Sequence, residues 1–218
     1  QSRSSAASDV YKRQIYSKAK SNNLITKATI EQYYDEKEKM FLSDRFIKGT
    51  CPKCGADDQN GDSCNECGAS YEVQDLKNPI SILSNTQPIK KDSEHIFFDL
   101  PQKTEMLNDF LKNVQLQKSV KNKLNEWLGD DLKKWDISRD APYFGFEIPD
   151  EKNKFFYVWV DAPIGYMASI SNWANKNDLN MNDLWSDKSD YEIHHFIGKD
   201  IAYFHGCLLY TSDAADDL

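Results

Sequence analysis

The sequence predicts an α/β fold, in which buried strands alternate with helices. Two short apolar runs, residues 155–160 and 193–197, have the composition of strands that are buried on both faces. The segment between them carries helical material that includes residues 165–176. A strand, a helix and a second strand in this order form a βαβ unit, which implies a parallel sheet. Because ligands of such sheets bind beyond the carboxyl ends of the strands, we expect residues 161–163 and 198–200 at a binding site.

The earlier part of the chain also mixes the two kinds of element. Residues 29–34 look helical, whereas residues 94–100 alternate polar and apolar side chains as a strand does. Two amphipathic helices follow, and their apolar positions are Leu107, Phe110, Leu111 and Val114 on the first and Leu116, Val120, Leu124, Trp127 and Leu128 on the second. Gly129 is a suitable end for the second helix.

Composition and charge limit the classes of function. The 218 residues are 39% hydrophobic and 12% aromatic, enough for one substantial core. Lys and Arg number 27 against 35 Asp and Glu, so the net charge is −8 and the sequence offers no basic nucleic-acid patch. No apolar stretch approaches the ~20 residues of a membrane-spanning helix, and the N-terminus lacks a secretory pattern. We therefore expect a cytoplasmic protein without membrane contact.

The two ends of the chain differ in character from the rest. Residues 4–14 read SSAASDVYKRQ and residues 207–216 read CLLYTSDAAD, and neither segment has an apolar period. With suitable codons, the two segments are encoded by the two strands of one DNA duplex, which resembles a transposon-type sequencing adapter. We therefore interpret residues 1–14 and 207–218 as translated adapter. The alternative is a pair of flexible native tails.

Four cysteines form two knuckles with metal-ligand spacing. Two residues separate Cys51 from Cys54 and Cys64 from Cys67, nine residues separate the two pairs, and glycine follows each pair. Such a tight turn presents both sulfurs to a metal while backbone N–H groups point at them. Four thiolates suit a tetrahedral zinc ion, and a closed set of ligands implies a structural role. Iron in a rubredoxin-like site, disulfides and free thiols are the alternatives.

Four longer phrases are more specific than any single motif. They are FLSDRFIKGTCPKC (residues 41–54), WDISRD (residues 135–140), WVDAPIGY (residues 159–166) and HFIGKD (residues 195–200). Together they resemble the methionyl-tRNA synthetase family of class I aminoacyl-tRNA synthetases, in the family's order, across residues 24–205. The resemblance implies a Rossmann-type nucleotide-binding domain with an inserted zinc-knuckle connective domain. The implied activity converts methionine and Mg-ATP to methionyl-adenylate and then passes the methionyl group to its tRNA.

The resemblance also implies a division of the chain into domains. Residues 15–40 would end the first catalytic half, residues 41–135 would form the connective insert with the zinc knuckle at 51–67, and residues 136–206 would form the second catalytic half. The family's HIGH and KMSKS motifs, which stabilise the ATP phosphates, do not occur in the sequence. We therefore expect a fragment of the enzyme that is inactive by itself.

Particular site residues follow from the matching positions of these phrases. The implied methionine pocket comprises Trp159, Ala162, Pro163, Tyr166, Ile201 and His205. The implied adenylate or activation site comprises Arg139, Glu147, Gly198 and Asp200. Without the resemblance, Trp159, Tyr166 and Ile201 would be interpreted as ordinary core, and His205 as a satisfied core histidine. The alternative function is a free-standing zinc-knuckle module that binds RNA or protein.

Overall fold

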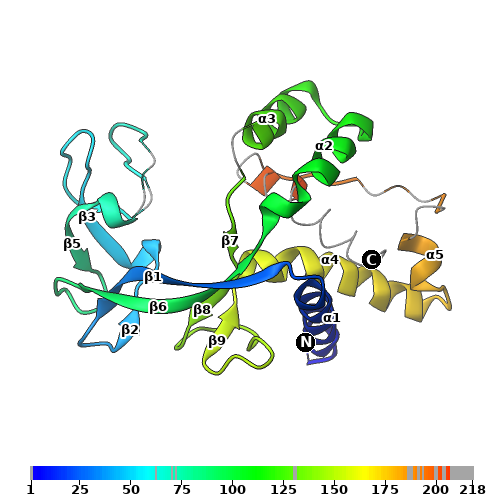
Figure 1. The fold of residues 1–218 in the computed structure, drawn as a ribbon, viewed down its shortest axis with the longest axis horizontal. Helices are drawn as coiled ribbons and strands as arrows, with labels where there is room; N and C mark the ends of the chain where they lie inside the picture. The colour runs from blue at the N-terminus through cyan, green and yellow to red at the C-terminus, as the bar shows by residue number, and fades with distance from the viewer. Residues whose placement is uncertain are drawn as a thin grey trace.

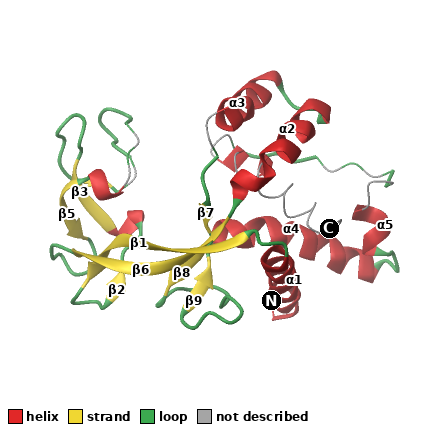
Figure 2. Cartoon of the chain, in the orientation of Figure 1, coloured by secondary structure: helices red, strands yellow, loops and turns green. Residues whose placement is uncertain are grey.

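A long two-stranded ribbon organises the molecule. Strands β1 (Ile25–Asp35) and β6 (Ile89–Phe98) cross the molecule side by side and connect a small β-rich end to a helical end (Figures 1 and 2). The computed structural model describes residues 2–61, 63–69, 71, 73–129, 132–185, 189–190, 192, 194–198, 201–202 and 205–206.

The ribbon forms the centre of a four-stranded antiparallel sheet. The order is β2 (Met40–Phe41), β1, β6 and β7 (Trp135–Asp136). The strand predicted at residues 94–100 is confirmed within β6, but the helix expected at 29–34 is wrong because these residues belong to β1. Their β-branched and aromatic side chains favour a strand once β6 supplies a hydrogen-bonding partner.

The small β-rich end carries the cysteine knuckles. Strands β4 (Gln59–Asn60), β3 (Ile47–Thr50) and β5 (Lys77–Ser81) form an antiparallel sheet in that order, and short 3₁₀ helices cover Asp44–Phe46 and Val73–Asp75. This end has its own core, formed by Tyr33, Leu42, Ile47 and Leu76. A Cβ atom at position 49 would lie 2.5 Å from the Lys77 carbonyl oxygen, so the close approach of β3 and β5 requires Gly49.

The two predicted amphipathic helices are confirmed. After a 3₁₀ turn at Leu100–Lys103, helix α2 (Thr104–Asn113) and helix α3 (Lys118–Gly129) pack against each other. Their buried core consists of Leu100, Leu107, Leu111, Leu124 and Leu128. Apart from Trp127, whose side chain lies outside the described residues, every apolar position predicted on the two helices is in or against this core.

Truncation of Leu124 tests the packing of the two helices. Leu124 is 2% exposed, so Leu124→Ala should lower the free energy of unfolding by about 2–5 kcal/mol through lost burial and a residual cavity. The neighbouring exposed residue supplies a matched control, since Asn125→Ala removes no buried contact. Urea unfolding measures both variants, and equal stability of the two would contradict this account of the core.

The C-terminal half departs from the predicted βαβ unit. The apolar run 155–160 is a strand only in β9 (Lys154–Phe156), which pairs antiparallel with β8 (Ser138–Asp140). Helix α4 (Val158–Lys176) begins within the same run, and α5 (Met181–Trp185) follows. Residues 194–197, which are the described part of the second predicted strand, form no strand, and all pairings among described strands are antiparallel. The parallel sheet was therefore a wrong expectation for this part of the chain.

The apolar run at residues 155–160 is buried although its first part lies in a strand and its last part in a helix. Phe156 on β9 is 2% exposed and packs with Ile96, Ile137 and Ile148, and Val160 on α4 packs against the same core. A short apolar run satisfies burial as a strand or as a strand followed by a helical turn, so its composition does not distinguish the two.

Helix α1 (Ser2–Ser21) contacts α4 and contributes Tyr16 to this core. The Tyr16 ring contacts the Phe156 ring edge-on with centroids 5.5 Å apart, and Lys12 Nζ lies 3.4 Å from the centroid of the Phe146 ring. The first part of α1 coincides with the adapter-like residues 1–14, and residues 207–218 lie outside the described residues. Neither α1 nor any other helix among the described residues is long and apolar enough to cross a membrane.

Candidate functional site

The four cysteine sulfurs converge on one point. Cys51 Sγ lies 3.9 Å from Cys67 Sγ, and Cys54 Sγ lies 3.6 Å from Cys64 Sγ. All four sulfurs lie within 4.8 Å of one another. These separations are far longer than the ~2.05 Å bond of a disulfide, so the thiols are free. The predicted set of four ligands is therefore assembled, and it could hold one metal ion.

Backbone N–H groups of each knuckle point at its buried sulfur. Cys51 Sγ accepts hydrogen bonds from the N–H groups of Lys53 and Cys54 at 3.4 and 3.5 Å. Cys64 Sγ accepts the equivalent bond from the Cys67 N–H at 3.4 Å. The N–H of Cys54 is the main cause that lowers the pKa of the Cys51 thiol to about 6. Thiolate is the form that binds metals, so the backbone N–H groups favour the metal-binding form of Cys51.

A glycine closes each knuckle, as the spacing predicts. The N–H of Gly55 donates to the Cys51 carbonyl at 3.1 Å, and the N–H of Gly68 donates to the Cys64 carbonyl at 2.9 Å. Their φ angles are +77° and +69°. Residues with a side chain adopt such positive φ angles only at a cost in energy, whereas glycine adopts them without that cost. The two knuckles are therefore near copies of one turn.

A second candidate site is a group of aromatic and imidazole rings. Tyr166, on helix α4, donates its hydroxyl hydrogen to His205 Nε2 at 3.2 Å. The ring centroids of Tyr166 and His205 are 5.7 Å apart, and the His195 ring lies 5.8 Å from the first and 5.5 Å from the second. The three rings come from distant parts of the sequence, so the fold builds this cluster by bringing His195 and His205 against Tyr166 on α4.

Hydrogen bonding fixes the tautomer of His205. A carbonyl oxygen can only accept, so the 2.9 Å contact between His205 Nδ1 and the Ile201 carbonyl requires a hydrogen on Nδ1. In the neutral ring Nε2 then carries the lone pair, which accepts the Tyr166 hydroxyl. Burial, and secondly the nearby His205, lower the pKa of His195. The surroundings of His195 therefore favour its uncharged form.

The other residues predicted for the methionine pocket lie beside this cluster or outside the described residues. Ala162 is exposed and sits one helical turn before Tyr166 on α4, on the same face. Ile201 is half-buried and supplies the carbonyl that binds His205. Trp159 and Pro163 belong to α4, but their side chains lie outside the described residues.

The residues predicted for the activation site are more widely separated than the rings around Tyr166. The N–H of Ile201 donates to the Gly198 carbonyl at 3.2 Å, which links Gly198 to the ring cluster. Asp200 lies outside the described residues. Arg139 and Glu147 lie on opposite sides of strand β9, since Phe155 pairs with Arg139 in β8 and forms a bridge with Glu147.

Arg139 is held in one orientation by three contacts. Its guanidinium donates to the Ser138 carbonyl at 2.6 Å and to Asp136 Oδ2 at 3.3 Å. Its Cζ atom lies 3.7 Å from the centroid of the Tyr157 ring. Burial is the main cause that raises the pKa of Tyr157, so the hydroxyl stays neutral beneath the guanidinium. A stacked and paired arginine of this kind presents a fixed positive charge.

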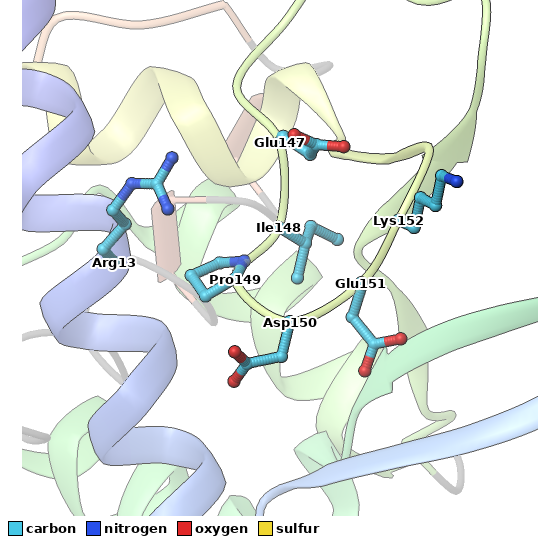
Figure 3. Close-up of a pocket in the computed structure, with 7 residues that line it drawn as sticks. All are labelled: Arg13, Glu147, Ile148, Pro149, Asp150, Glu151 and Lys152. Carbon is cyan, nitrogen blue, oxygen red and sulfur yellow. The ribbon is translucent and has the colours of Figure 1, made fainter.

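Glu147 lines a pocket between helix α1 and the loop that precedes β9. Figure 3 shows Arg13 on one side and residues 147–152 on the other, with the Glu147 carboxylate directed away from Arg13. Arg13 pairs instead with Asp9 at 3.0 Å on its own helix. One wall of this pocket therefore consists of adapter-like sequence, and the pocket contains none of the rings around Tyr166.

Two residues of the site were not assigned from sequence. His195 opens the HFIGKD phrase, and its ten-residue distance from His205 gave no periodic signal. Tyr157 lies in the apolar run that was expected to be a strand, so its contact with Arg139 depended on the turn into α4.

Comparison with known proteins first identifies the class. A family model described as tRNA synthetases class I (M) matches residues 2–216. The chain therefore belongs to the class I tRNA synthetase family. This result confirms the predicted class I synthetase catalytic fold, with mixed helices and strands and a four-cysteine cluster.

The similar solved structures narrow the resemblance to one member of that class. Methionyl-tRNA synthetase of Mycobacterium tuberculosis bound by methionyl-adenylate matches 98% of this chain with a TM-score of 0.62 and 16% identity. The apo form of the same enzyme matches 96% of this chain with a TM-score of 0.59 and 16% identity. The chain spans 37% of the length of each of these synthetases. The resemblance drawn from the four sequence phrases is confirmed.

Proposed function

We propose that this chain is a segment of a methionyl-tRNA synthetase, a cytoplasmic enzyme that activates methionine with Mg-ATP and transfers it to its tRNA. The proposal rests on the membership of this chain in the class I tRNA synthetase family and on the hydrogen bond that joins Tyr166 and His205 in the fold described above. The segment would contribute the methionine pocket and part of the adenylate site.

The ring cluster suits a methionine side chain. A thioether is apolar, polarisable and a weak hydrogen-bond acceptor, and it makes favourable contacts with aromatic ring edges. Tyr166 and His205 supply ring surfaces together with a hydroxyl and an imidazole group. We propose that Trp159, Ala162, Pro163 and Ile201 complete this pocket.

The activation site would use the fixed positive charge of Arg139. Adenylate formation develops negative charge around the α-phosphate, and a preorganised cation stabilises that charge. We propose that Arg139 acts there and that Gly198, Asp200 and Glu147 lie close to the adenylate. The contacts of Arg139 with Asp136 and Tyr157 support its role because they hold the guanidinium before substrate binds.

We propose zinc as the metal of the cysteine site. A tetrahedral ion with Zn–S distances of about 2.3 Å has sulfur–sulfur edges of roughly 3.8 Å. The separations of 3.6 and 3.9 Å fit that edge length. Four protein ligands leave no position for water or substrate, so the ion would stabilise the knuckles rather than take part in the reaction.

The proposed division of the chain places the zinc site within a connective insert. Residues 15–40 would belong to the first catalytic half, residues 41–135 to the insert and residues 136–206 to the second half. The β1–β6 ribbon would then carry the knuckle end on the catalytic core. We further propose that residues 1–14 and 207–218 are translated adapter.

Methionine-dependent exchange of pyrophosphate into ATP tests the function. The full-length synthetase that contains residues 15–206 should catalyse exchange with methionine, and it should prefer methionine to leucine by at least tenfold. The 218-residue chain alone should give none, because its sequence contains neither HIGH nor KMSKS. A full-length enzyme that activates another amino acid and not methionine would refute the proposal. Exchange by the 218-residue chain would refute only the expectation that the segment is inactive by itself.

A further inference from the structure

His95 is a fully buried histidine that lies between two carboxylates. It sits on β6 with no exposed surface. Its Nδ1 atom lies 2.7 Å from Asp136 Oδ2, and its Nε2 atom lies 3.1 Å from Asp140 Oδ2. The two aspartates belong to β7 and β8, so one imidazole joins β6 to both strands of the WDISRD segment.

The geometry determines the protonation of the ring. Both carboxylates are acceptors, so each ring nitrogen must carry a hydrogen to bond its partner. The hydrogen bonds of His95, Lys154 and Ser93 outweigh burial and lower the pKa of Asp140 to about 2. Burial alone would lower the pKa of His95, but its hydrogen bonds to the two aspartates raise it. The two carboxylate contacts and the raised pKa therefore both favour the imidazolium form of His95.

The imidazolium is connected to Arg139 through one oxygen atom. Asp136 Oδ2 accepts from His95 Nδ1 and also from the Arg139 guanidinium at 3.3 Å. The other oxygen, Oδ1, accepts from the N–H of Ser138 at 3.0 Å and from its hydroxyl at 3.1 Å. Both oxygens of the Asp136 carboxylate are thus hydrogen-bonded, and His95 is the side chain of β6 that binds this carboxylate.

We propose that His95 is a positioning residue for Arg139, and that as an imidazolium it holds Asp136 in the orientation that binds the guanidinium. Loss of the imidazolium removes the β6 partner of Asp136 Oδ2. Ser138 still holds Oδ1, but the carboxylate can then tilt, and Arg139 loses its place over the Tyr157 ring. The relevance of this orientation to methionine activation rests on the proposed function, whereas the coupling of His95 to Arg139 does not.

The coupling should depend on pH with a defined sign. The charged groups that face His95 are Asp136 on β7, Asp140 on β8 and, through Asp140, Lys154 on β9. Because the folded-state pKa of His95 is raised, its stabilising contribution is complete below the unfolded value of about 6.5. That contribution falls as the pH rises through the higher folded-state pKa.

Nuclear magnetic resonance of the 218-residue chain tests the proposal directly. The two ring nitrogens of His95 should both show imidazolium shifts at pH 7. The Arg139 side-chain hydrogens should show ring-current shifts from Tyr157. The variant His95→Gln keeps one donor and loses the second, so these Arg139 shifts should disappear while the circular dichroism spectrum is retained. His194→Ala is the matched control, because His194 is exposed and pairs only with Glu192 among its described contacts.

Activity supplies the second readout in the full-length synthetase. His95→Gln should lower kcat for methionine-dependent exchange by about 10- to 100-fold and leave KM for methionine within about twofold, since the substrate pocket is not touched.

Retained Arg139 shifts in folded His95→Gln would overturn the proposal. Asp136→Asn provides an independent variant that should release Arg139 in the same way. If both variants unfold, a neutral His95 ring at pH 7 in the unsubstituted chain still overturns it. An enzyme that does not use methionine would refute the proposed function and leave the His95–Arg139 coupling standing.

Discussion

Cys64→Ser should abolish metal binding and unfold the knuckle end of the molecule. Cys64 is 3% exposed, and its sulfur lies 3.6 Å from Cys54 Sγ and within 4.8 Å of the other two sulfurs. Structural zinc contributes apparent binding free energy of roughly 10–16 kcal/mol, and in such small domains that energy is folding energy. The knuckle end has only a small separate core, so it cannot replace the loss.

The effect should remain local. The α2–α3 core contains no residue of the knuckle end, and the β8–β9 sheet belongs to a third cluster. Zinc per chain, measured by elemental analysis, should fall from one to zero, and amide exchange should become fast across β3, β4 and β5 only. Glu66→Ala is the matched control, since Glu66 is exposed between the two ligands of the same knuckle. A Cys64→Ser chain that retains one tightly bound zinc, or an unsubstituted chain whose thiols react freely, would eliminate this metal site.

The cysteine site shows what sequence spacing can establish. Two ligand pairs, each closed by a glycine, specify a local turn whose geometry depends on few distant contacts. The amphipathic helices are similar, because the spacing of Leu107 and Leu111 or of Leu124 and Leu128 requires only one partner surface. These features were therefore predicted correctly from residues alone.

The failures occurred where a distant partner decides the local conformation. Residues 29–34 became a strand because β6 pairs with them from more than fifty positions away. The apolar run at 155–160 is divided between β9 and α4 since both parts reach the same core. In both places short-range composition permits two elements, and tertiary contacts select one.

The ring cluster around Tyr166 was predicted from the sequence only in part. Tyr166 and His205 were assigned through the family resemblance, and their hydrogen bond brings them together. His195 and His95 carried no comparable signal, because a histidine in an alternating or apolar segment has the same sequence pattern whether it faces water or an aspartate. The burial of His95 follows from the pairing of β6 with β7, which the sequence does not encode locally.

Loss of either ring of the proposed methionine pocket should reduce methionine use by the full-length synthetase. His205→Ala removes the acceptor of the Tyr166 hydroxyl and one ring wall. The family resemblance also places Trp159 in this pocket, so we expect Trp159→Ala to remove a second aromatic surface. Losing a well-packed aromatic contact costs on the order of 1–3 kcal/mol, which is roughly a 5- to 150-fold loss of kcat/KM for methionine.

Tyr166→Phe separates the hydrogen bond from the ring surface. It keeps the ring contacts with His195 and His205 and removes only the hydroxyl, so its loss of kcat/KM should be smaller than that of His205→Ala. Trp173→Ala is the matched control, because Trp173 is a 51% exposed aromatic residue on the same helix. Steady-state kinetics with varied methionine and saturating Mg-ATP measure kcat/KM for each variant. If His205→Ala and Trp159→Ala both keep the normal kcat/KM, these residues are ordinary core, and methionine binds at another part of the enzyme.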